Sequence, residues 1–135
     1  MEATAQMHVI RLKPGQDLKK ELQDFVQREK IEAGWIVTCV GSLTQTHLRF
    51  ADQPQGTRSS GYFEIVSLVG TLSTNGSHFH ISVSDSSGQT IGGHLLDGNI
   101  IYTTAEIVIG SSSELTFIRE KDGTTQWEEL QIKRR

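Results

Sequence analysis

The chain has 135 residues, of which 36% are hydrophobic and 21% charged, and its formal net charge is −3 at pH 7. This length fits one domain with a buried core, and this composition excludes a disordered chain. The acidic balance argues against a phosphate-binding surface, because Lys and Arg are scattered except at the closing Lys133, Arg134 and Arg135. We interpret those three residues as a solvated tail.

The sequence also supports a prediction of the protein's cellular location. No apolar run approaches the length of a transmembrane span, and the first residues, "MEATAQMHVIRL", lack the features of a signal peptide. The single cysteine, Cys39, lies in the apolar segment "WIVTCVGSL" and is expected to be a buried small hydrophobe. We therefore expect a cytoplasmic protein without a membrane partner, and a nuclear location stays open.

The first predicted elements are a strand and a helix. Residues 7–12 form a short strand that ends at Pro14 and Gly15. Residues 16–30 form an amphipathic helix, with Asp17 as its N-cap and Gly34 just past its C-terminus. The apolar residues that share one face of this helix are Leu18, Leu22, Phe25 and Val26.

The remainder of the chain is β in character. Between its strands lie turns rich in Gly, Asn, Asp and Ser, and the polar segment 52–61 is expected to be a mobile surface loop. Many short strands with one helix predict an α+β fold: a compact single domain over residues 1–135 with a mostly antiparallel sheet. The predicted strands are 34–43, 46–51, 62–73, 78–85, 89–96, 99–109, 114–120 and 125–132.

Two of these strands, 62–70 and 100–109, are apolar on both alternating sets of side chains. An ordinary two-layer sheet shows one polar face, so either the sheet curls or one face packs against another subunit. Because one helix covers little of a sheet, we favour oligomerisation.

The histidines are concentrated in "GSHFHISVSDSSGQTIGGHLL", which holds three of the five in the chain. The turn "DSSGQ" suits a type I turn with Gly88 left-handed in a bulge, which pairs Asp85 with Gln89. In that register His80 lies opposite His94, and His78 lies on the same face of the hairpin. The opposite face is then coherently apolar, and a slip of one residue would scramble both faces.

Three imidazoles this close can converge on one metal ion. Cross-strand Cβ atoms are about 5 Å apart, and His78 stands about 6.6 Å along the strand from His80. Gly92 and Gly93 leave room beside His94 for an ion or a small ligand. The pattern predicts a divalent transition metal on His78, His80 and His94, with zinc as the default. The alternative is an exposed polar strand face.

Two carboxylates lie on apolar strands, Glu64 and Glu106. An unpaired carboxylate there would be costly, so we expect each to be ion-paired or hydrogen-bonded. Glu106 is also the candidate fourth ligand or catalytic base, whereas His8 and His47 are read as structural or surface residues.

The segment "GSHFHISVSDSSGQTIGGHLLDGNIIYTTAEIVI" closely resembles the central motif of the plants and prokaryotes conserved (PPC) domain. "GWIVTCVGSLTQTHLRFA" and "YFEIVSLVGTLS" are similar to earlier motifs of that family, so the resemblance covers nearly the whole chain. It implies a compact domain that assembles as a homotrimer, and it implies that His78, His80 and His94 form the metal site found in stand-alone prokaryotic-type members. No established enzymatic activity comes with it.

Three functions follow as hypotheses. The first is a metal-binding homotrimer that serves a small-molecule ligand or substrate, and whether it is an enzyme stays open. The second is an oligomerisation or protein-interaction module. The third is the DNA binding that the family's label suggests, which we disfavour because the chain is acidic and lacks the Arg-Gly-Arg-Pro core of an AT-hook.

Overall fold

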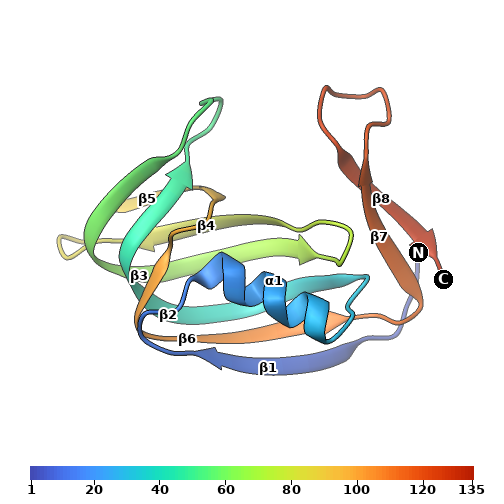
Figure 1. Cartoon of the computed structure of the whole chain (residues 1–135), viewed down its shortest axis with the longest axis horizontal. Coiled ribbons are helices and arrows are strands. Elements are labelled where there is room, and N and C mark those ends of the chain that lie inside the picture. The colour runs from blue at the N-terminus through green and yellow to red at the C-terminus, as the bar shows by residue number, and fades with distance from the viewer.

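The computed structural model describes residues 1–135 and consists of a six-stranded antiparallel sheet, one helix and a separate two-stranded hairpin (Figure 1). The strand order of the large sheet is β1-β6-β2-β3-β4-β5, and β7 pairs only with β8. The predicted α+β class and single domain are confirmed. The elements are β1 (Gln6–Leu12), α1 (Leu18–Arg28), β2 (Gly34–Arg49), β3 (Thr57–Leu72), β4 (His78–Ser84), β5 (Thr90–Leu95), β6 (Ile100–Ser111), β7 (Leu115–Glu120) and β8 (Glu129–Arg134).

The helix α1 lies across one face of the large sheet (Figure 1). Asp17 caps it as predicted, because its side chain accepts a hydrogen bond from the Lys20 N–H. All four residues of the predicted apolar face are buried. The C-terminal prediction was wrong: the helix ends at Arg28, Lys30 takes the left-handed conformation with φ 53°, and Gly34 begins β2.

Three strands also differ from the sequence prediction. The predicted strands 34–43 and 46–51 are one strand, β2, whose register shifts between Leu43 and Gln45. Strand β3 begins at Thr57, inside the predicted loop, and β8 begins at Glu129 rather than at residue 125. The polar residues at the start of β3 carry no apolar alternation, so the pattern alone did not extend that strand into them.

One face of the large sheet and the helix enclose the main core of 21 buried apolar residues. Cys39 belongs to this core, and burial raises the pKa of its thiol to about 12, so it is the small hydrophobe expected from the sequence. No helix has the length and apolar character that crossing a membrane requires.

The other face of the sheet is open and carries exposed apolar side chains. Val9, Val40 and Tyr62 are 75%, 59% and 62% exposed, and the Tyr62 ring packs 5.0 Å from the Tyr102 ring. The doubly apolar pattern of β3 and β6 therefore has one half in the core and the other half on this surface, which we call the open face.

The sheet also curls at one end. The end of β2 pairs with β5, so that Leu48 faces Leu95 and Arg49 faces His94. This second pairing brings residues from distant parts of the chain beside the histidine hairpin. It is the feature of the fold that shapes the site.

Candidate metal centre

The hairpin β4–β5 forms as the sequence predicts. Gly88 has φ 79°, its N–H donates to the Asp85 carbonyl at 2.9 Å, and the Asp85 N–H donates to the Gln89 carbonyl at 2.9 Å. The Asp85 side chain also accepts hydrogen bonds from the Ser87 and Gln89 N–H groups. The resulting register pairs His80 with His94, so the predicted pairing is confirmed.

The three histidine side chains gather on one side of this hairpin. Their ring centroids are 4.7 Å apart for His78 and His80, 5.3 Å for His78 and His94, and 5.9 Å for His80 and His94. The Nε2 atoms of His78 and His80 are 3.1 Å apart, and one nitrogen from each ring lies within 4.8 Å of the others. Three nitrogens bound tetrahedrally to zinc at 2.0–2.1 Å stand roughly 3.3 Å apart, so small ring rotations suffice to complete the set.

The surroundings of two rings of the triad, those of His78 and His94, favour the neutral form. Burial and, to a smaller extent, the positive charge of Arg49 together lower the pKa of His94 to about 4. Burial also lowers the pKa of His78, followed by the effects of His80 and Arg119. Neutral imidazole is the form that binds a metal, so His78 and His94 are ready to ligate at physiological pH.

Close packing of the backbone requires glycine at positions 92 and 93 beside His94, in addition to the predicted need to leave room for an ion or ligand. A Cβ on Gly93 would lie 2.6 Å from the Arg49 carbonyl oxygen, and one on Gly92 would lie 2.9 Å from the Ile81 carbonyl oxygen. Both glycines also line a cavity of about 330 Å³ together with all three histidines. The strands next to β5 therefore leave no room for a side chain at either glycine, and the cavity beside the three histidines stays open.

The structure does not bring Glu106 to the histidines. Glu106 lies on β6, where it pairs with Val40 of β2. Strand β6 is three strands away from β4, which corresponds to roughly 14 Å across the sheet. The Glu106 carboxylate accepts a hydrogen bond from Thr104 at 3.3 Å, which agrees with the hydrogen-bonded role expected for it. The prediction for Glu64 was wrong: its side chain makes no ion pair or hydrogen bond, because it is exposed and water solvates the carboxylate.

The two isolated histidines serve other contacts. His8 lies 2.9 Å from the Ser111 hydroxyl and packs edge-on against the Phe25 ring. The Nδ1 atom of His47 lies 2.6 Å from the Asp97 carbonyl oxygen. Neither histidine belongs to the triad, which agrees with their predicted role as structural or surface residues.

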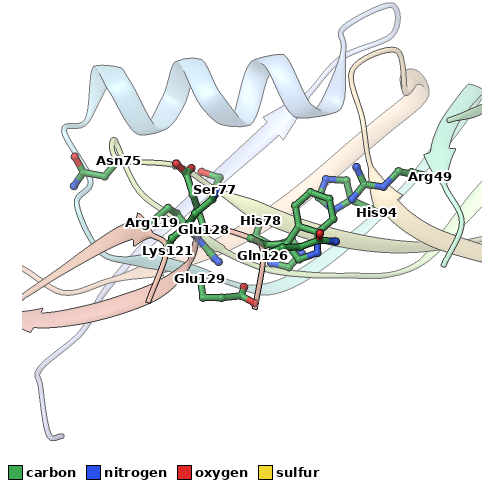
Figure 2. A pocket seen from close by; sticks show the side chains of 12 residues that line it. Arg49, Asn75, Ser77, His78, His94, Arg119, Lys121, Gln126, Glu128 and Glu129 are labelled. Atoms are coloured by element: carbon green, nitrogen blue, oxygen red, sulfur yellow. The ribbon is translucent and has the colours of Figure 1, made fainter. Parts of the chain in front are cut away.

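Beside the triad lies a larger cavity of about 750 Å³ that sequence reasoning missed (Figure 2). His78 and His94 line it, and so do Arg49 from β2 and Arg119 from β7. The Arg119 guanidinium donates to the Thr71 hydroxyl at 2.8 Å, and Thr71 is the strand partner of His78. No local pattern reveals these arginines, because only the pairing of β2 with β5 and the docking of β7–β8 bring them here.

Comparisons with known proteins agree with this fold. The family model described as the Plants and Prokaryotes Conserved (PCC) domain, the family called PPC above, matches residues 1–113. A curated relative, the bifunctional protein GlmU of Synechococcus sp. (strain JA-3-3Ab), is 45% identical over 128 residues. That match covers 95% of the chain, but the chain spans only 21% of the relative's length.

Two solved structures are also similar. A hypothetical protein from Salmonella cholerae-suis superposes with a TM-score of 0.98 at 42% identity, covering 100% of this chain and 98% of that one. A metal-containing protein from Archaeoglobus fulgidus has a TM-score of 0.78 at 22% identity, covering 96% of this chain and 95% of that one. At this lower identity the second likeness shows the fold alone.

Proposed function

The chain belongs to the Plants and Prokaryotes Conserved domain family, and from this premise we propose that it binds a divalent transition metal through His78, His80 and His94. The observation that carries the proposal is the convergence of three ring nitrogens within 4.8 Å of one another. Zinc is the default ion, although imidazole ligands also suit nickel, copper and iron. The structural relative from Archaeoglobus fulgidus, described as metal-containing, adds support.

Three protein nitrogens leave a coordination position for a further ligand. In zinc proteins a set of three protein ligands with an open position is typical of catalytic sites, whereas structural sites use four. When bound, the ion would supply Lewis acidity to an oxygen of a small molecule. This chain's own residues hold the ion and line the adjoining cavity of about 750 Å³, where a small molecule fits.

Elemental analysis of protein purified without a histidine tag tests the metal site. We expect about one zinc per chain in the wild type and none in His80→Ala/His94→Ala. His47→Ala is the matched control, because it removes an imidazole outside the triad. Wild-type protein that takes up no metal at micromolar zinc, or a double variant that binds as well as wild type, overturns the proposal.

Self-association is the second part of the proposal, as a homotrimer built on the open face. Exposed apolar side chains gather there, and contiguous apolar patches of this kind usually mark interaction sites. The residues that form the patch include Met7, Val9, Val37, Val40, Tyr62, Val66, Val69 and Tyr102.

Light scattering at low micromolar concentration should report three chains per particle. Val40→Asp places a charge on the open face without touching the core and should weaken the assembly. Ile132→Asp on β8 is its control, because Ile132 is also exposed, at 49%, but lies outside the large sheet. A wild-type monomer that stays folded contradicts the homotrimer and favours a different role for the patch.

DNA binding is the alternative function that the family's label suggests. The net charge of −3 gives little counterion release, so we expect no appreciable affinity for duplex DNA at physiological salt. The closing basic residues are not the free tail expected from the sequence, because Lys133 and Arg134 are exposed residues of β8 and Arg135 is ion-paired with Glu32 at 2.8 Å. Sub-micromolar binding that weakens steeply with salt would favour the DNA-binding function instead.

A further inference from the structure

The cavity of about 750 Å³ has two walls of different origin (Figure 2). One wall is the histidine hairpin with the end of β2, and it carries His78, His94 and Arg49. The other wall is the hairpin β7–β8 and its loop, and it carries Arg119, Lys121 and Trp127. The proposed metal would therefore lie at the edge of a space that a small molecule can enter.

Arg49 is an unpartnered cation next to the metal site. It faces His94 across the β2–β5 pairing, and its guanidinium has neither a hydrogen bond nor a carboxylate within 4.0 Å, since the only ion pair of the chain joins Arg135 and Glu32. A guanidinium presents a planar fork of donors that matches a carboxylate. No acidic residue lines the cavity at this end, where Figure 2 shows Arg49 beside His94.

The opposite end of the cavity holds mixed charges. Figure 2 shows Arg119 and Lys121 close to Glu128 and Glu129. The Nε atom of Arg119 is buried without a hydrogen-bond partner, although another nitrogen of the same guanidinium donates to Thr71. Because this Nε atom is buried, a ligand oxygen at this end would meet the terminal donors of the Arg119 guanidinium and the ammonium of Lys121, which also lines the cavity. The neighbouring acids limit the net positive charge and disfavour a polyanion.

We propose that this cavity binds a small dicarboxylate. One carboxylate pairs with Arg49 and supplies an oxygen to the metal, and the other reaches the terminal guanidinium donors of Arg119 and the ammonium of Lys121. This assignment rests on the proposed metal site. It names the substrate or ligand class of that site as a short polar organic acid.

The hairpin β7–β8 is then the part of the chain that determines specificity. Family-model similarity ends at residue 113, so the histidines and Arg49 lie inside the matched region and Arg119, Lys121 and Trp127 lie outside it. The shared region would hold the metal and the first carboxylate. The hairpin would select what is attached to that carboxylate.

Calorimetric titration of zinc-loaded protein with malate and with lactate separates the two ends of the ligand. Malate carries both carboxylates, whereas lactate has only the one assigned to Arg49. We expect Arg49→Gln to weaken both acids at least tenfold and Arg119→Gln to weaken only malate. Arg134→Gln is the matched control, because it removes the same charge on β8 away from the cavity.

Two additional arms keep the test decisive. Inorganic phosphate distinguishes a carboxylate site from a general oxyanion site, and binding as tight as that of malate overturns the dicarboxylate class. Trp127 is 63% exposed and lines the cavity, so malate should change its fluorescence, and Trp127→Phe should abolish that signal but not the binding heat. Lys121→Gln provides a further weakened variant if Arg119→Gln fails to fold.

The outcomes separate this inference from the metal site. Stoichiometric zinc with no malate binding, or with unchanged binding in both arginine variants, overturns the dicarboxylate inference and leaves the metal site intact. Protein that takes up no zinc overturns the metal site and this inference with it.

Discussion

Two hairpins meet at the candidate site, and they are held in place very differently. The apolar side of β4 is fully enclosed by the main core, where Phe79, Ile81 and Val83 are at most 2% exposed. The hairpin β7–β8 has only a small cluster of its own around Leu115 and Phe117, and residues 121–128 at its far end are exposed. In Figure 1 it projects from one end of the sheet.

The difference in anchoring suits the two hairpins to different proposed roles, metal binding for β4–β5 and ligand recognition for β7–β8. Ligands to a metal need fixed positions, and a strand anchored in a large core supplies them. A wall with few buried contacts changes its sequence and conformation at little cost to the fold. The proposed metal site on β4–β5 and the proposed ligand contacts on β7–β8 should therefore respond to mutation independently.

The largest expected contrast is in stability. Phe79→Ala should lower the free energy of unfolding by about 3–5 kcal/mol, because the main core cannot close around the lost ring. Phe117→Ala should cost only about 1–3 kcal/mol, because its smaller cluster borders solvent. Urea denaturation of both variants measures the two values, and a larger loss for Phe117→Ala would break the comparison.

Metal binding should stabilise the protein through one hairpin only. With free zinc at 100 times its Kd, the wild type should gain about 2.7 kcal/mol in unfolding free energy. Trp127→Ala on the far hairpin should gain the same amount, and His80→Ala/His94→Ala should gain none. Thermal unfolding with and without zinc measures this, and a smaller gain in Trp127→Ala would show that the far hairpin helps to hold the ion.

Hydrogen exchange should distinguish the two hairpins in the wild type without any mutation. Amide protons of β4 should exchange on the order of 100-fold more slowly than those at the far end of β7–β8, because opening β4 disrupts the main core. Mass spectrometry of peptides covering 78–84 and 115–134 provides the measurement. Equal protection would show that the far hairpin is as firmly anchored as the near one.

The smallest expected effect is on pH dependence, because His94 is partly exposed and solvent screening reduces what its lowered pKa contributes to stability. The folded state lowers the pKa of His94 to about 4, below the roughly 6.5 of an unfolded chain. The unfolded chain therefore binds more protons between these values, so the stability of metal-free protein should fall as pH drops from about 6.5 to about 4. His94→Gln should flatten this fall. Chemical denaturation in chelator at several pH values tests it, and an unchanged slope in the variant would contradict the lowered pKa.

The histidine hairpin was predictable from the sequence because its information is local. The turn residues Asp85 and Gly88 determine the register, and strand alternation then places His78, His80 and His94 on one face. The helix was predictable for the same reason, from Asp17 and one apolar stripe. The C-terminal end of the helix was not predictable, because Lys30 adopts the left-handed conformation that the sequence pattern assigns to glycine.

The sequence by itself thus determined the fold class, the main helix, the register of β4 with β5 and the three candidate ligands. Only the tertiary structure decided that Glu106 lies three strands from the histidines, that β2 closes onto β5 and that Arg49 and Arg119 join the cavity. Turns and alternation act over a few residues, whereas these placements depend on contacts between segments far apart in the chain. The candidate metal ligands were therefore predictable from local sequence, whereas the cavity beside them was not.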